Sequence, residues 1–234
     1  MKNDTQHLIR EQAMKYSLLV MFQRVLGLLC FLLAAGTISS LQGWIYFSLY
    51  FFISMITLIV MLIRHPNTLS ERGKKHDDTP PWDKVLLALY VPLAFYGIYI
   101  VAGLDVRYNG TYLDIVSMII GILLFIISAI FMIWLILENE HFESTARIQK
   151  DRNQTVITTG PYRIIRHPGY TSIILWAISV PLIFGSILSG MVSLIIIAVI
   201  ILRTYLEDTM LQKELSGYRT YCTQVKYRLI PFLW

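Results

Sequence analysis

The chain alternates between long uncharged stretches and shorter polar segments. Residues 44–63, 85–104 and 115–137 each contain no Asp, Glu, Lys or Arg. Each is about 20 residues long, which is the length of helix that crosses the roughly 30 Å hydrocarbon layer of a bilayer. The pattern therefore predicts a membrane-spanning helix over each of these three ranges.

The first charge-free stretch is longer than a single crossing requires. It runs from residue 25 to residue 63 and is interrupted by the polar, glycine-containing segment Thr37–Gly43. Such a segment is typical of a turn between two elements. We therefore expect one helix over about 18–39 and a second over about 44–63.

The uncharged stretch 170–202 is also too long for one crossing, since a continuous helix of this length would measure about 50 Å. Gly185 and Gly190, each beside a serine, lie near its middle. They favour two short helices, 170–185 and 189–205, in a tight hairpin, and one broken long helix is the alternative. The predicted fold class is thus an all-α polytopic membrane helical bundle of about six transmembrane helices, ending in this hairpin and a cytoplasmic tail.

The distribution of basic residues predicts the orientation of the bundle. If both termini are cytoplasmic, 19 of the 20 Lys and Arg residues lie on the inner side, and Arg107 lies on the outer side. Basic residues favour the cytoplasmic side in short loops, so we expect a multi-pass protein with both ends inside, in the inner membrane if the source is bacterial.

Only 15% of the residues are charged and 56% are hydrophobic. The net charge of +5 therefore indicates attraction to membrane lipids, and we expect no nucleic-acid partner.

Residues 158–172 form the first candidate site. His167-Pro168 places a proline at the expected first turn of a helix, where its missing N–H is tolerated. The free N–H groups of such a turn attract anions, and Arg163 and Arg166 add positive charge. The plain alternative is a proline-started membrane helix with basic residues anchored among lipid headgroups.

Arg203, Glu207 and Asp208 form the second candidate site, at the inner end of the last predicted membrane helix. Arg203 and Glu207 are four residues apart and share one helix face. Two adjacent acids at this depth are able to hold a cationic ligand. The plain alternative is an arginine that reaches the membrane surface and forms a modest ion pair within its helix.

A metal site is not expected. His141 lies among Glu138, Glu140 and Glu143, and such a group is able to bind a metal ion. These residues are, however, clustered in one polar segment just after a predicted helix, with no convincing ligand from elsewhere. We interpret them as a solvated turn.

The two candidate sites together resemble a known family. Gly160-Pro-Tyr-Arg-Ile-Ile-Arg-His-Pro-Gly-Tyr170, followed by Arg203-x-x-x-Glu-Asp208, is similar to the C-terminal signature of isoprenylcysteine carboxyl methyltransferase-like proteins. The resemblance covers roughly residues 138–234. Two positions depart from the family pattern: Asp208 stands where eukaryotic members have a second Glu, and Ser172 stands where a Gly often follows the tyrosine.

The resemblance implies an S-adenosylmethionine pocket built from the hairpin and the tail, with a lipophilic acceptor entering from the bilayer. The chain would form a single domain, 1–234, with a four-helix part over 1–137 and a cofactor-binding part over 138–234. The cofactor-binding residues implied are Tyr162, Arg166, His167, Pro168, Tyr170, Glu207 and Asp208. Arg203 would face the methyl-transfer site, and Arg203 and Glu207 are the implied catalytic residues.

The expected reaction is direct displacement at the sulfonium methyl group, which depends on orientation more than on acid–base groups. A carboxylate acceptor needs no general base, so O-methylation of an isoprenylcysteine-like carboxylate is the favoured reading. A phospholipid or other lipid N-methyltransferase is the nearest alternative. An NADPH-dependent membrane reductase and a non-catalytic membrane binding or transport protein are the others.

Overall fold

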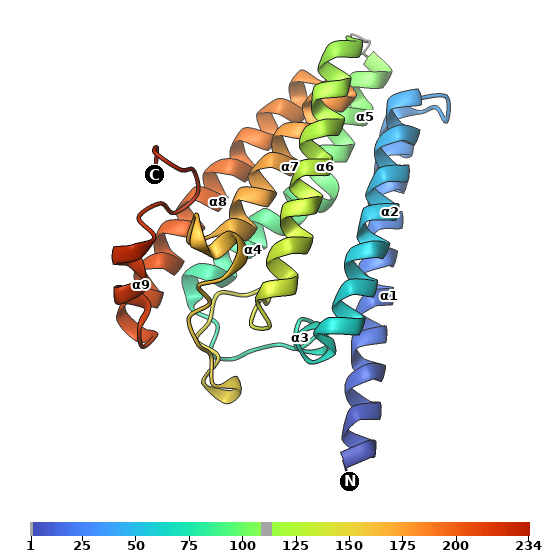
Figure 1. The fold of residues 1–234 in the computed structure, drawn as a ribbon. Helices are drawn as coiled ribbons and strands as arrows, with labels where there is room; N and C mark the ends of the chain where they lie inside the picture. Colours follow the sequence, from blue (N-terminus) through green and yellow to red (C-terminus); the bar gives the residue numbers. More distant parts are fainter. Residues whose placement is uncertain (1, 109–113) are drawn as a thin grey trace.

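The described structure consists of helices and loops (Figure 1). The computed structural model describes residues 2–108 and 114–234, and these ranges contain no strands. The helices of the bundle are α1 (Lys2–Ala35), α2 (Leu41–Arg64), α4 (Pro81–Pro92), η1 (Leu93–Gly97), α5 (Ile98–Tyr108), α6 (Ile115–Glu138), α7 (Pro168–Phe184) and α8 (Ile187–Glu214). The shorter elements are α3 (Pro66–Glu71), η2 (Lys150–Arg152), η3 (Gly160–Arg163) and α9 (Tyr218–Gln224).

The bundle has the helices that the hydrophobic pattern predicts. Within the described residues, five helical stretches are long and apolar enough to cross a membrane: 6–35, 41–64, 81–108, 115–138 and 187–214. α7 is also apolar but has only 17 residues. The predicted all-α polytopic bundle is confirmed, with α7 as its short sixth helix. α1 begins well before the predicted start at residue 18, because its polar first part continues the helix.

The hairpin between α7 and α8 is formed by a turn of two residues. Gly185 ends α7 in the left-handed conformation (φ 59°), which a residue without a Cβ adopts at no steric cost. Ser186 then caps α8, because its hydroxyl accepts a hydrogen bond from the Ser189 N–H at 3.0 Å. Asp105 of α5 accepts hydrogen bonds from the Ser186 hydroxyl (2.6 Å) and the Leu188 N–H (3.0 Å). The stretch 170–202 is therefore two helices, as predicted.

Small residues let neighbouring helices approach closely, which is common in membrane bundles. A Cβ added to Gly121 of α6 would lie 2.9 Å from the backbone nitrogen of Ile183 in α7. Two turns further along α6 in the same pair, the Ser172 hydroxyl donates to the Ser128 carbonyl and the Ser128 hydroxyl donates to the Ser172 carbonyl, each at 2.8 Å. Figure 1 shows α6, α7 and α8 side by side, with the α1–α2 pair next to them.

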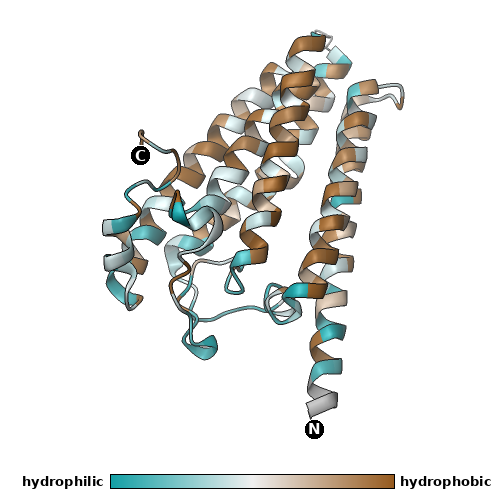
Figure 2. Ribbon diagram, viewed as in Figure 1, coloured by the Kyte–Doolittle hydropathy of each residue, from teal (hydrophilic) through white to brown (hydrophobic). Residues whose placement is uncertain are grey.

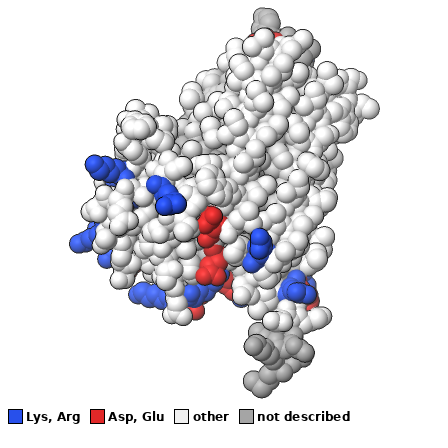
Figure 3. Space-filling view, viewed as in Figure 1, with Lys and Arg blue, Asp and Glu red and all other residues white. Residues whose placement is uncertain are grey.

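Apolar and charged residues separate along the bundle axis. Figure 2 shows brown apolar residues along most of the length of the helices and teal residues at the lower end and around α9. On the face drawn in Figure 3, Lys, Arg, Asp and Glu gather toward the same lower end. We call this the charged end; it contains the start of α7 and the end of α8. Large apolar side chains such as Leu33 and Ile187 are each 77% exposed elsewhere on the bundle. The chain is an integral membrane protein.

Candidate active site

A cavity of about 730 Å³ lies among α1, α2, α4, α6, α7 and α8. Small-molecule sites usually have about 300–1,000 Å³. The predicted site residues that line the cavity are Tyr162, Arg166, His167, Pro168, Tyr170, Arg203 and Glu207. They come from η3, the start of α7 and the end of α8, so the fold brings both predicted motifs to one cavity.

Asp208 lies behind the cavity wall and is fully buried. Its carboxylate accepts hydrogen bonds of 2.8 to 3.1 Å from five side chains: Arg166, His167 (through Nε2), Gln212, Tyr218 and Arg228. These donors belong to the segment before α7, to α8, to α9 and to the segment after it. Asp208 therefore ties the C-terminal segment to the α7–α8 hairpin. Its direct contact with a cofactor stays a prediction.

Arg166 strengthens the same junction. Its Nη1 donates hydrogen bonds to the carbonyls of Val225 (2.9 Å) and Lys226 (2.8 Å), and its backbone N–H donates to the Tyr227 carbonyl (2.9 Å). Burial disfavours the charged guanidinium, but hydrogen bonding to Asp208 outweighs it and raises the pKa of Arg166 above its ordinary value. Arg166 therefore stays charged while it borders the cavity.

Glu207 differs from its neighbour because its half-buried side chain borders the cavity. The Tyr170 hydroxyl donates a hydrogen bond to its carboxylate, and the Tyr170 ring stacks on the His167 imidazole with 5.8 Å between the ring centroids. Within residues 2–108 and 114–234, Glu207 forms no ion pair. A carboxylate next to aromatic rings, without a salt bridge in the described residues, suits a positively charged ligand.

Arg203 is buried and forms an ion pair with α4. Its Nε donates to Asp83 at 2.6 Å and its Nη2 donates to the Ser144 carbonyl at 2.8 Å. Asp83 is fully buried and also accepts a hydrogen bond from the Ala146 N–H at 2.8 Å. The Arg203 guanidinium lies 5.4 Å from the centroid of the Tyr170 ring. Arg203 thus pairs with Asp83, rather than with Glu207 four residues along its own helix.

Tyr162 is fixed in the cavity wall by two hydrogen bonds. Its hydroxyl accepts a hydrogen bond from the Asn139 side-chain amide at 2.7 Å, and its carbonyl accepts one from the Tyr221 hydroxyl at 2.6 Å. Pro168 is the first residue of α7, as the sequence predicts, with His167 before it. Tyr162 and the start of α7 are therefore held in place by α6 and α9.

Residues 116–216 match the model of the phospholipid methyltransferase family. This segment is less than half of the chain, and over it the sequence is similar to membrane methyltransferases. The matched segment contains α6, α7 and α8 and every predicted site residue. It confirms the resemblance to the isoprenylcysteine carboxyl methyltransferase-like group, which includes this family. None of the curated proteins matches the chain.

The family match also chooses among the predicted classes of function. It supports a membrane methyltransferase with a lipid-related acceptor, in place of the reductase and the non-catalytic alternatives. The identity of the atom that receives the methyl group, oxygen or nitrogen, is a finer question. The match ends before α9, so the C-terminal partners of Asp208 lie outside it.

Sequence reasoning missed Asp83, although its carboxylate holds Arg203. The only local signal is an acid in the first turn of a helix that starts Pro81-Trp-Asp, and acids are generally favoured there. Ser172, which departs from the family pattern, lines the cavity, and its hydroxyl donates to the carbonyl of Ser128 in α6.

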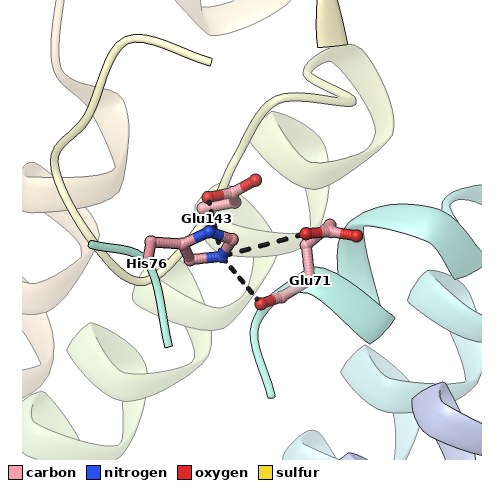
Figure 4. Close-up of side chains that lie close together, drawn as sticks. All are labelled: Glu71, His76 and Glu143. Carbon is pink, nitrogen blue, oxygen red and sulfur yellow. Dashed lines mark hydrogen bonds and ion pairs between the residues drawn. The ribbon is translucent and has the colours of Figure 1, made fainter. Parts of the chain in front are cut away.

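One group of side chains at the charged end has the composition of a metal site. Figure 4 shows the His76 imidazole between the carboxylates of Glu71 and Glu143, and one ligand atom from each lies within 4.8 Å of the others. Glu143, however, accepts hydrogen bonds from Arg147 at 2.9 Å and from Arg152 at 3.0 Å. These guanidinium groups neutralise the carboxylate, so the arrangement favours an ion-pair network between loops.

Proposed function

We propose that this membrane methyltransferase transfers a methyl group from S-adenosylmethionine to a lipophilic acceptor within the cavity. The family that matches residues 116–216 generally uses this cofactor. The observation that carries the proposal is Glu207, a cavity carboxylate without an ion pair in the described part of the chain. S-adenosylmethionine, when bound, supplies an electrophilic methyl group on a positively charged sulfur atom.

The residues around Glu207 fit a cationic ligand of this kind. The carboxylate offers a counter-charge, the Tyr170 hydroxyl holds it in one orientation, and the ring of Tyr162 provides apolar surface. Arg166 and His167 are fixed by Asp208 at the same end of the cavity. In this proposal they shape the wall that receives the cofactor. Asp208 then contributes by positioning them, in addition to its predicted contact.

The acceptor is proposed to be a carboxylate of an isoprenylcysteine-like group. Such a nucleophile is already deprotonated, and it needs only orientation beside the methyl group. Arg203 is proposed to face it, with the salt bridge to Asp83 holding the guanidinium in position. N-methylation of a lipid amine is the second candidate, favoured by the phospholipid description of the matching family.

The cofactor site is tested by Glu207→Gln. A charge-assisted hydrogen bond is worth roughly 1.5–3 kcal/mol, so calorimetry should show S-adenosylmethionine binding weakened about ten- to a hundredfold. Glu214→Gln is the matched control, because Glu214 is an exposed acid on the same helix. Arg203→Ala should leave cofactor affinity within a few-fold while turnover falls sharply.

Three results would contradict parts of this proposal. Unchanged cofactor binding in Glu207→Gln would remove Glu207 from the site. Binding of NADPH by the parent protein, with no binding of S-adenosylmethionine, would favour the alternative function of a membrane reductase. Methyl transfer to phosphatidylethanolamine, with none to a prenylated cysteine carboxylate, would replace O-methylation by lipid N-methylation.

A further inference from the structure

Arg24 is a charged residue deep inside a membrane-spanning helix. About 16 Å of helix separates it from the end of α1 at Ala35. Because the hydrocarbon layer is roughly 30 Å thick, this distance places Arg24 near its middle. A charge at this depth is energetically costly and usually marks a functional site. Arg24 also lies outside the segment that matches the methyltransferase family.

The protein surrounds the Arg24 guanidinium with aromatic rings. Its central carbon lies 4.5 Å from the centroid of the Tyr50 ring and 4.8 Å from that of Phe95. Phe95 belongs to the π-helical turn η1, a type of irregularity that is frequent at functional sites. The ring faces stabilise the cation. The centroid of the Tyr50 ring lies in turn 5.5 Å from that of Tyr46 and 6.1 Å from that of Tyr99.

Arg24 lacks an anionic partner among the described residues. Its Nε donates a long hydrogen bond to the Ser54 hydroxyl at 3.4 Å, and its buried Nη1 has no acceptor among the described residues. Arg147 and Arg203, which border the same cavity, are instead paired with carboxylates. The bundle therefore holds an uncompensated positive charge at membrane depth.

This charge belongs to the same cavity as the proposed methyl-transfer site. Arg24 lines the cavity together with Tyr90, Tyr170 and Glu207. Phe22, two residues earlier in α1, borders the cavity as well and is 59% exposed on the apolar surface. The cavity therefore reaches the surface that faces lipid.

We propose that Arg24 is a specificity-determining residue that binds an anionic group of the acceptor lipid, a carboxylate or phosphate other than the group that receives the methyl group. The inference rests on the proposed function, since it treats the cavity as the site of the acceptor. A carboxylate or phosphate supplies the missing counter-charge and is able to accept two hydrogen bonds from a guanidinium. Neutral lipids of the same length leave Arg24 uncompensated, so the residue selects anionic amphiphiles.

The test measures lipid binding without cofactor or turnover. Native mass spectrometry on the full chain in a neutral maltoside detergent compares three probes with one oleoyl chain each: oleate, lysophosphatidate and the neutral monoolein. The parent should bind at least one anionic probe about ten- to a hundredfold more tightly than monoolein. Arg24→Gln should lose this preference. Arg10→Gln, which removes an exposed charge from the same helix, should keep it.

The outcomes separate this inference from the proposed function. Equal binding of all three probes by the parent, or a preference that survives in Arg24→Gln, would overturn the role of Arg24. Arg24→Lys retains the charge and should retain most of the preference for anionic probes over monoolein. This variant keeps the test informative if Arg24→Gln does not fold. The anionic probe that binds more tightly identifies the group as carboxylate or phosphate. S-adenosylmethionine binding by the parent, measured in parallel, tests the proposed function by itself.

Discussion

The buried ion pair between Asp83 and Arg203 should show strong coupling when its two members are replaced. Asp83 is 0% exposed and Arg203 is 5% exposed, so removal of either leaves the other as an unpaired buried charge. Such a change costs about 3–5 kcal/mol. We therefore expect Asp83→Leu and Arg203→Met each to lower the free energy of unfolding by this amount.

The double variant should recover most of that loss. Apolar replacement of a buried ion pair is often neutral or stabilising by about 1–4 kcal/mol. The Ala146 N–H and the Ser144 carbonyl lose their partners, and each unsatisfied buried group costs about 1–3 kcal/mol. These terms largely offset one another, so the double variant should lie within about 2 kcal/mol of the parent. The coupling energy between the two sites is then at least about 3 kcal/mol.

Reversible unfolding in mixed micelles, followed by far-UV circular dichroism, measures these free energies. The exposed pair Glu11–Lys15, joined at 2.7 Å on α1, provides the control cycle, because such pairs contribute only about 0.2–1 kcal/mol. If the two changes at Asp83 and Arg203 are additive, or if each costs less than about 1 kcal/mol, the buried pair does not hold α4 to α8 as described here.

Two further predictions concern packing and orientation. Gly121→Leu should destabilise the α6–α7 contact by roughly 1–3 kcal/mol. Gly190→Ala should leave the stability nearly unchanged, since a Cβ there meets its nearest neighbour at an ordinary 3.7 Å. If both variants lower the thermal unfolding temperature equally, the packing argument is contradicted. With both termini inside, a maleimide that does not cross membranes should label Ile38→Cys in intact cells and reach Asp151→Cys only after permeabilisation. Labelling of Asp151→Cys in intact cells would reverse the proposed orientation.

The helices could be predicted from the sequence because charge is excluded from the hydrocarbon layer over ranges that match a helix length. The ranges 44–63 and 115–137 lie within one to three residues of α2 and α6. The start of α1 was predicted too late, since apolar content reports where a helix enters the membrane and not where its backbone hydrogen bonds begin. The hairpin turn at Gly185 was predicted correctly, because it depends on the backbone conformation of a single glycine and not on contacts with distant parts of the chain.

The site residues could be grouped by their motifs, but their separate tasks could not be read from the sequence. Glu207 and Asp208 are adjacent, yet one borders the cavity and the other faces the C-terminal segment, because consecutive helical residues point about 100° apart. Asp83 and Arg203 are far apart in the chain and meet only through the packing of α4 on α8. Arg24 was counted with the inner basic residues although it lies within the helix predicted over about 18–39, and the structure shows that α1 continues beyond it to Ala35.

The network around Asp208 also orders the events of membrane insertion. Asp208 enters the bilayer edge with the α7–α8 hairpin, and at that stage Arg166, which precedes it in the chain, is already available as a counter-charge. Tyr218 and Arg228 are synthesised later and reach the carboxylate only after α9 has folded back against the hairpin. The full set of hydrogen bonds around Asp208 therefore requires the chain as far as Arg228, which follows the last membrane helix.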